Sequence, residues 1–265
     1  MNTIDTIVAF LDQFAPADLA EEWDNVGLLV GDRRQGVERV MTCLTITPAS
    51  AAEAIDRGAG LIVTHHPLPF RAARRLTSDT LEGRLLLDLI RAGVAIYSPH
   101  TAFDSAHQGI NQRLAAGLQL AEVRPLVPVE PPLPGEPLGS GRRGHLAAPL
   151  PLDQFAERVK SFLSIGRVQL VGRADQPVEH VAVACGAAGE LLTAAQQAGC
   201  DCLVLGETNF HTSLAAEASG VALVLTGHFA SERFAVVELA GVLAAEFADL
   251  DIWASQREQD PLRWA

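Results

Sequence analysis

Two neighbouring histidines, His65 and His66, are the first residues along the chain whose position suggests metal chemistry. The apolar run LIVT leads directly into them, and Pro67 then interrupts regular structure. This pattern predicts a strand that presents two imidazoles at its carboxyl end, where open α/β sheets bind ligands. Adjacent side chains diverge in extended backbone, so each imidazole could bind a different metal ion, or one could bind while the other orients it.

A second pair, His228 and Glu232, is four residues apart where a helix should begin after the strand VALVLTG. This spacing places both side chains on one face of the first turn, and a neutral imidazole with a carboxylate suits Zn²⁺, Mn²⁺ or Fe²⁺. The alternative is an ordinary surface pair in which Ser231 is a turn or capping residue.

Asp104 ends the segment IYSPHTAFD at a third strand end, where it is either a metal ligand or the N-cap of a helix that starts near Gln108. Three histidines and two carboxylates on three strand ends are what two metal ions sharing a carboxylate need. The sequence therefore predicts a dinuclear divalent-metal centre on His65, His66, Asp104, His228 and Glu232.

The elements that position these residues are those of an α/β protein with mixed sheets flanked by helices, because short aliphatic runs alternate with Ala/Leu-rich segments of helical period. Strands are expected near 38–46, 60–64, 93–98, 167–172, 180–185, 201–206 and 221–226. Helices are expected near 3–14, 49–58, 79–92, 108–117, 152–163, 188–198 and 229–247. Prolines crowd residues 125–151, which predicts a connector between a first lobe, 1–125 plus 226–265, and a second lobe, 126–225.

The two lobes show signs of an internal duplication. Stretches around 39–66 and 180–207 align without a gap and place His65 on Glu207. After one extra residue, the His100-x-x-x-Asp104 segment also falls on His228-x-x-x-Glu232. We therefore expect related βαβ units, with His100 and Glu207 as candidate catalytic residues that orient a ligand or transfer protons. Ordinary hydrogen bonding at a strand end is the other interpretation of both.

Composition excludes several classes of protein. The net charge of −12 argues against a nucleic-acid partner, and no stretch approaches the roughly 20 apolar residues of a membrane span. The amino terminus lacks a basic flank followed by an apolar block, so we expect a cytoplasmic protein without a membrane partner. Local basic runs occur at Arg71–Arg75 and at Arg142 and Arg143, where a solvated surface is the simpler interpretation.

Six segments resemble the successive signatures of the Nif-three-like dinuclear metal-centre family, whose members carry the label GTP cyclohydrolase 1 type 2 homologue. They are EEWDNVGLLVGD, VTHHPLPF, YSPHTAFDSAHQGIN, GSGRRGHL, ACGAAGE and TGHFASE. The resemblance assigns metal binding to the same five residues and implies a toroidal homohexamer with metal sites facing an internal cavity. The chain departs from the family pattern at Thr45, where an acidic residue is usual, at Ala102 and at Thr212.

The predicted function is a metal-dependent hydrolase, because bound metal ions lower the pKa of a water molecule to about 7. The resemblance implies GTP as substrate, and Arg142 and Arg143 of GSGRRG are candidate phosphate donors, although an ordinary turn fits that segment equally. Two divalent ions and two carboxylates leave a net charge near +2, which favours an anionic small molecule. The alternative function is a non-catalytic metal-binding, metal-delivery or regulatory scaffold.

Overall fold

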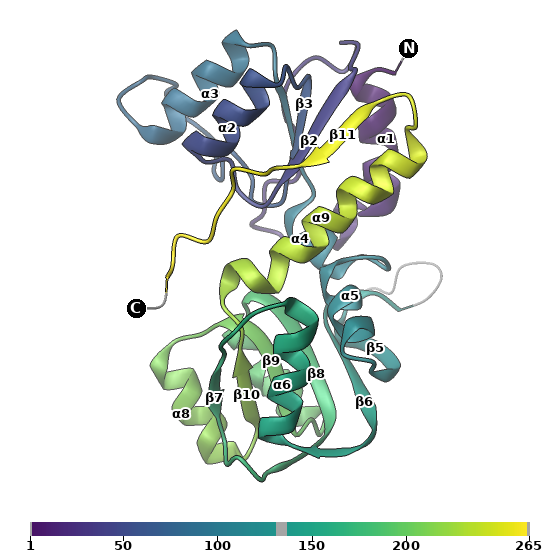
Figure 1. Cartoon of the computed structure of the whole chain (residues 1–265), viewed down its shortest axis with the longest axis vertical. Helices are drawn as coiled ribbons and strands as arrows, with labels where there is room; N and C mark the ends of the chain where they lie inside the picture. The colour runs from purple at the N-terminus through teal and green to yellow at the C-terminus, as the bar shows by residue number, and fades with distance from the viewer. Residues whose placement is uncertain (1, 131–136, 264–265) are drawn as a thin grey trace. The chain divides into compact units, whose positions relative to one another are not determined.

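A computed structural model describes residues 2–130 and 137–263 of the chain, and helices α4 and α9 join its two compact units (Figure 1). Unit 1 contains Met1–Phe103 and Ala235–Ala265, and unit 2 contains Asp104–Phe234. Helix α4 (His100–Ser105) spans the first boundary and helix α9 (His228–Glu246) spans the second. Both joining helices therefore begin with a residue that the sequence singled out.

Unit 1 is built on a five-stranded sheet in the order β1-β4-β3-β2-β11. Strands β4, β3, β2 and β11 are parallel to one another, and β1 at the edge pairs with β4 in the antiparallel direction. The strands are β1 (Gly27–Val30), β2 (Arg39–Cys43), β3 (Leu61–Thr64), β4 (Ala95–Ser98) and β11 (Asp251–Ala254). The remaining helices of this unit are α1 (Ile4–Phe14), η1 (Ala17–Leu19), α2 (Pro48–Asp56) and α3 (Leu81–Arg91).

Helices cover both faces of the unit 1 sheet. Helices α2 and α3 bury one face through a core that includes Met41, Ile62 and Leu89. Thr42, which points to the opposite face, donates from its hydroxyl to the carbonyl of Val236 in α9. Figure 1 accordingly shows α2 and α3 on one side of the sheet and α1 and α9 on the other. With both faces covered, the parallel strands read as continuous apolar runs.

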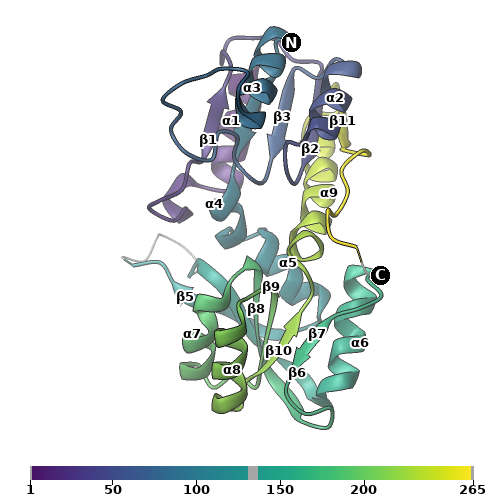
Figure 2. The same cartoon turned by 90° about the vertical axis from the view of Figure 1, so that its left-hand side faces the viewer.

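Unit 2 is built on a six-stranded sheet in the order β5-β6-β8-β9-β10-β7, in which only β8, β9 and β10 are parallel. Figure 2 shows α7 and α8 on one side of this sheet and α6 on the other. The strands are β5 (Ala121–Pro128), β6 (Gly139–Pro151), β7 (Gln169–Val171), β8 (Pro177–Ala187), β9 (Cys202–Glu207) and β10 (Ala222–Leu225). The helices are α5 (Ile110–Gly117), α6 (Leu152–Leu163), η2 (Gly189–Leu191), α7 (Leu192–Gln197) and α8 (Phe210–Ser219).

The strand order confirms the predicted duplication. The series β1-β4-β3-β2 in unit 1 corresponds to β7-β10-β9-β8 in unit 2, each with three parallel strands and an antiparallel edge. Val40 pairs with Leu61 in the first unit, and Ala182 pairs with Leu203 in the second. These pairs are in the register of the sequence alignment that places His65 on Glu207.

The predicted connector at 125–151 is wrong where the structure describes it, because β5 and β6 occupy most of that range; residues 131–136 lie outside the described part. Proline is tolerated in β5 because this strand is at the sheet edge. The unit boundary accordingly falls after Phe103 and not after residue 125, since α5 packs against β6 and β8. Among the described residues, no helix combines the length and apolar character needed to cross a membrane.

Candidate metal centre

Three histidines of unit 1 lie together at the carboxyl ends of β3 and β4. A ring nitrogen of each of His65, His66 and His100 lies within 4.8 Å of one from the other two. The ring centroid of His65 is 5.1 Å from that of His66 and 5.2 Å from that of His100. The sequence predicted His65 and His66 as ligands, and the structure adds His100 to the same cluster.

The sheet backbone continues past the end of β3 and fixes the two adjacent histidines. The backbone N–H of His65 donates to the carbonyl of Cys43 at 3.0 Å, and that of His66 donates to the carbonyl of Leu44 at 2.8 Å. The Ser98 hydroxyl donates to the carbonyl of His65 at 2.6 Å. The histidines are thus presented from rigid backbone, which keeps a binding site pre-organised.

Asp24 orients His100, although it lies before β1 and far from His100 in the chain. His100 Nδ1 donates to Asp24 Oδ1 at 2.7 Å, and the Thr101 backbone N–H donates to the other oxygen at 3.1 Å. Burial raises the pKa of Asp24, but hydrogen bonds from His100 and Thr101 outweigh it and lower the pKa to about 2. An ionised Asp24 that accepts from Nδ1 fixes the orientation of the His100 ring and leaves Nε2 as the ring nitrogen that can bind a metal ion.

Thr45 holds the third imidazole, since its Oγ1 is 2.7 Å from His66 Nδ1. The C-terminal segment fixes Thr45 in turn. The Glu258 carboxylate accepts from the backbone N–H groups of Leu44 at 2.9 Å and of Thr45 at 2.6 Å. Thr45 occupies the position where the family pattern has an acidic residue. It therefore places a hydroxyl next to His66, and the Glu258 carboxylate binds the backbone of Thr45.

In unit 2, His228 lies between two carboxylates. Its Nδ1 donates to Glu207 Oε1 at 2.9 Å, and its Nε2 is 3.2 Å from Glu232 Oε2. The hydrogen bond to Glu232, opposed by burial and reinforced by Glu207, raises the pKa of His228 to about 9. A carboxylate on Nδ1 that leaves Nε2 beside a second carboxylate is the usual setting of a metal-binding histidine. The predicted helix face shared by His228 and Glu232 is confirmed.

A glycine at the end of β8 makes room for the Glu232 side chain, which is only 3% exposed. Gly186 has φ +65°, and a Cβ atom there would be 2.5 Å from Glu232 Oε1. The Gly186 N–H donates to the Ser231 hydroxyl at 2.9 Å, and that hydroxyl donates to the His228 carbonyl at 2.7 Å. Ser231 thus links the end of β8 to the first turn of α9. It lies inside the helix and Glu232 is buried, so the alternative of a surface pair with Ser231 as a capping residue is wrong.

Asp104 is in α4, four residues after His100, and contacts β8 within unit 2. Its Oδ1 accepts from the Cys185 thiol at 3.0 Å. Burial, together with the Asp104 and Glu232 carboxylates, raises the pKa of Cys185 well above its usual value, so the thiol stays protonated. Cys185 is therefore a hydrogen-bond donor that positions Asp104. The N-cap of α5 is Gly109 and not Asp104.

The donor set of each unit fits a divalent transition metal. Unit 1 gathers three imidazoles, and unit 2 gathers an imidazole and a buried carboxylate; such nitrogen and oxygen ligands suit Zn²⁺, Mn²⁺ and Fe²⁺. In each unit, a carboxylate accepts a hydrogen bond from the Nδ1 atom of the histidine that follows the third parallel strand. The predicted ligands are divided between the units, with His65 and His66 in unit 1 and with Asp104, His228 and Glu232 in unit 2.

Arg142 is not available as a phosphate donor, contrary to one interpretation of GSGRRG. It is 2% exposed, and burial lowers its pKa to about 10. Its Nε donates to Gln112 Oε1, and its two terminal nitrogens donate to four backbone carbonyls, those of Gly139, Gly141, Ser105 and Ala106. Every donor of the guanidinium is engaged within unit 2, so this arginine stabilises the fold.

Two aromatic side chains of unit 1 lie beside the histidine cluster. Trp23 is 62% exposed and Phe70 is 45% exposed, with ring centroids 6.0 Å apart. Each centroid is also 6.0 Å from that of His100. Exposed aromatic rings next to potential ligands offer a stacking surface for a planar molecule.

Sequence reasoning did not identify Asp24, Thr45, Trp23 or Cys185 as site residues. Asp24 and Trp23 belong to the polar and aromatic stretch EEWDN, which precedes a strand and interrupts the apolar pattern. That stretch is a usable signal, because acidic and aromatic residues in loops are frequent in binding sites. Thr45 stood out only as a departure from the family pattern, and Cys185 carries no such signal, because the partners of both lie elsewhere in the sequence.

Comparison with known proteins places these motifs in a family. The model of the family described as Duf34/NIF3 (NGG1p interacting factor 3) matches residues 2–261. A Clostridium acetobutylicum protein named GTP cyclohydrolase 1 type 2 homolog is 31% identical over 258 residues, covering 96% of each chain. A Helicobacter pylori protein named GTP cyclohydrolase 1 type 2 is 29% identical over 247 residues, covering 92% of each. The crystal structure of a Bacillus cereus protein related to NIF3 has a TM-score of 0.90 at 24% identity, covering 100% of this chain and 99% of the other. The chain therefore belongs to the Duf34/NIF3 family.

Proposed function

We propose that this chain binds two divalent metal ions through His65, His66, Asp104, His228 and Glu232, and that it hydrolyses an anionic purine nucleotide. The observation that supports this most strongly is His228, held by Glu207 at Nδ1 and next to Glu232 at Nε2. Such an arrangement fixes the tautomer and raises the basicity of the metal-binding nitrogen. When bound, the metal ions supply Lewis acidity that generates hydroxide from water near neutral pH.

The residues around the ligands have separate roles in this proposal. Asp24 and Glu207 orient His100 and His228 through the Nδ1 atoms. His100 Nε2 is the candidate acceptor for a proton released from water, since its opposite nitrogen is already engaged. Cys185 keeps Asp104 in place through its S–H donor.

The substrate class is proposed from two features. Trp23 and Phe70 supply an exposed aromatic surface for a purine, and the loop that follows carries the exposed arginines Arg71, Arg74 and Arg75 for phosphate groups. The names of the Clostridium and Helicobacter relatives point to GTP for those proteins. We extend that substrate to this chain as part of the proposal.

The test measures metal content and nucleotide turnover on one batch of the full chain purified without an affinity tag. We expect two divalent ions per chain and release of product from GTP. In Glu232→Gln we expect loss of at least one ion with fold retained, because the side chain keeps its size and loses its charge. Glu217→Gln, an exposed position on α8, is the matched control and should keep both ions.

The outcomes distinguish the possible functions. Full metal content in Glu232→Gln would exclude Glu232 as a ligand. Two bound ions without turnover of GTP or any other nucleotide would favour the alternative, a metal-delivery or regulatory scaffold. Quenching of tryptophan fluorescence by GTP that persists in Trp23→Phe would exclude the aromatic surface as the purine site.

We also propose that the chain assembles with copies of itself into a closed homohexamer. In unit 2, Phe210 is 71% exposed and Leu214 is 45% exposed, one turn apart on α8, which leaves apolar surface for a second copy to bury. A monomeric mass by light scattering at micromolar protein concentration would contradict this assembly.

A further inference from the structure

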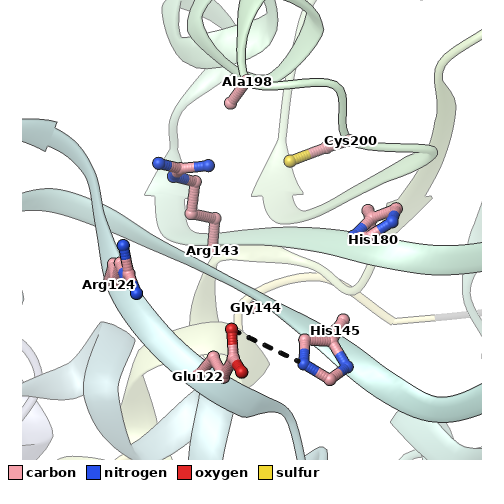
Figure 3. Close-up of a pocket in the computed structure, with 8 residues that line it drawn as sticks. All are labelled: Glu122, Arg124, Arg143, Gly144, His145, His180, Ala198 and Cys200. Carbon is pink, nitrogen blue, oxygen red and sulfur yellow. Dashed lines mark ion pairs between the residues drawn. The ribbon is translucent and has the colours of Figure 1, made fainter.

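A polar pocket lies in unit 2, at the opposite end of β8 from Cys185 and Gly186. It has a volume of about 230 Å³. Its lining residues come from β5, β6, the start of β8 and the segment after α7: Glu122, Arg124, Arg143, Gly144, His145, His180, Ala198 and Cys200 (Figure 3). His180 and Cys185 are five residues apart in an extended strand, a separation of roughly 16 Å. The pocket is therefore separate from the residues of unit 2 proposed to bind metal.

The lining is basic in a chain whose net charge is −12. Arg124 and Arg143 contribute two guanidinium groups, His145 and His180 contribute two imidazoles, and Glu122 is the one carboxylate among the lining residues. Glu122 faces His145, with 4.0 Å between its Oε2 and the ring Nε2. Among the residues that the structure describes, no carboxylate oxygen lies within 4 Å of the guanidinium of Arg124 or Arg143. Within residues 2–130 and 137–263, the two arginines thus lack a protein counter-ion.

Strand register places the basic groups in two rows on one face of the sheet. Arg124 of β5 pairs directly with Arg143 of β6, and His145 of β6 pairs with His180 of β8. Side chains of directly opposed residues have Cβ atoms about 4.5–5.5 Å apart, and like charges in such pairs destabilise a sheet. An anion bound between the two guanidinium groups would remove that repulsion.

The end of a helix leaves this part of the sheet open. Helix α7 ends at Gln197, and Ala198 and Cys200 form the adjacent wall. Burial raises the pKa of Cys200 to about 11, so its thiol adds no negative charge. His145, His180 and Cys200 do not form a group whose ligand atoms lie within 4.8 Å of one another, so they do not make a metal site.

We propose that this pocket binds the phosphate group of a small phosphorylated molecule. The planar guanidinium fork of each arginine matches phosphate oxygens, and two such forks in one pocket can supply charge-assisted hydrogen bonds. His145 donates from Nδ1 to the carbonyl of Leu146 at 3.1 Å, which leaves its Nε2 directed toward Glu122 and the pocket. His180 lies beside it, with ring centroids 6.3 Å apart, and offers a further donor.

The test uses inorganic phosphate as the probe, titrated into the full chain by calorimetry after dialysis against a chelator, so that phosphate cannot bind through a metal ion. Wild type should show saturable binding of one phosphate per chain. Arg124→Gln and Arg143→Gln should each weaken it about tenfold or more, because each removes a charge-assisted donor pair. Arg173→Gln, which changes an exposed arginine of the same unit, should bind as wild type.

Three outcomes bear on the proposal. Absence of saturable binding, or binding that neither Arg124→Gln nor Arg143→Gln weakens, would overturn it. Equal affinity for sulfate and phosphate would support an anion site of low selectivity, whereas tighter binding of glycerol 3-phosphate than of inorganic phosphate would support an organic phosphate. Since the metal is removed, these results do not depend on whether the chain hydrolyses a nucleotide.

Discussion

Replacement of Glu53 by glutamine tests how unit 1 holds the C-terminal segment. Glu53 is in α2 and is 2% exposed. Its carboxylate accepts from Trp253 Nε1 at 3.1 Å, from the Ser255 hydroxyl at 2.7 Å and from the backbone N–H groups of Gln256 at 3.0 Å and Arg257 at 2.9 Å. One buried side chain therefore anchors β11 and the residues that follow it.

The expected loss follows from how glutamine can bind in the same place. Its single carbonyl oxygen can replace Oε2 and accept from Ser255, Gln256 and Arg257, while its amide group then faces the Trp253 N–H. The Trp253 N–H is then buried without an acceptor, which lowers the stability by about 1–3 kcal/mol. Each of the three remaining hydrogen bonds loses about 1 kcal/mol when the acceptor becomes neutral. Part of this is regained because a neutral amide is easier to bury than a charge. We expect a net loss of about 2–4 kcal/mol in the free energy of unfolding.

The pH dependence of this loss has a definite sign. Burial raises the pKa of Glu53, but the hydrogen bonds from Gln256, Ser255, Arg257 and Trp253 outweigh it and keep the pKa below the ordinary value of a glutamate. A carboxyl with a lowered pKa in the folded state stabilises the protein above its unfolded-state pKa, and this contribution disappears as the pH falls through the folded-state value. The difference between wild type and Glu53→Gln should be constant from pH 8 to about 5 and shrink below about 4.5.

The assay is urea denaturation followed by circular dichroism at a series of pH values. Glu38→Gln, an exposed carboxylate of the same unit, is the control and should change the free energy of unfolding by less than about 0.5 kcal/mol. A loss below about 1 kcal/mol in Glu53→Gln, or a loss that does not change with pH, would refute the hydrogen-bond argument.

Three further substitutions test the residues around the candidate centre. Gly186→Ala should weaken metal binding about tenfold or more in a metal titration, because the new Cβ displaces the Glu232 carboxylate. Unchanged affinity would show that Gly186 is not needed to make room for Glu232. Arg142→Met should lower the free energy of unfolding by about 4 kcal/mol or more in urea, since four buried carbonyls lose their donor; wild-type stability would refute a structural role. Thr45→Val should weaken metal binding about 10–100-fold without changing the melting temperature, because His66 loses its Nδ1 partner; an equal loss of stability would indicate a packing effect instead.

The sequence by itself determined the parallel cores of both units. Runs such as LIVT are apolar throughout because both faces of β3 are covered, and the helices that alternate with them carry a clear 3.6-residue period. The position of His65 and His66 at the end of a strand is also a local property, because Pro67 stops the strand immediately after them. The internal alignment worked for the same reason, since it compares two copies of one local pattern.

Tertiary structure alone decided the elements whose partners are distant or whose composition misleads. Strands β5 and β6 are rich in proline and glycine and read as a connector, yet edge pairing and the neighbour β8 stabilise them. Strand β11 completes the unit 1 sheet beside β2, more than two hundred residues earlier in the chain. Neither pairing leaves a periodic signal, because it depends on surfaces that the folded sheet creates.

The same division applies to the candidate centre. Residue types and spacing indicated the imidazoles and carboxylates that can bind metal, whereas the groups that orient them come from elsewhere in the chain. Asp24 reaches His100 across 76 residues, and Glu258 reaches Thr45 across 213. The sequence can show a chemically able side chain at the end of a strand, but the hydrogen bonds that fix its tautomer and direction form only when the fold brings distant segments together.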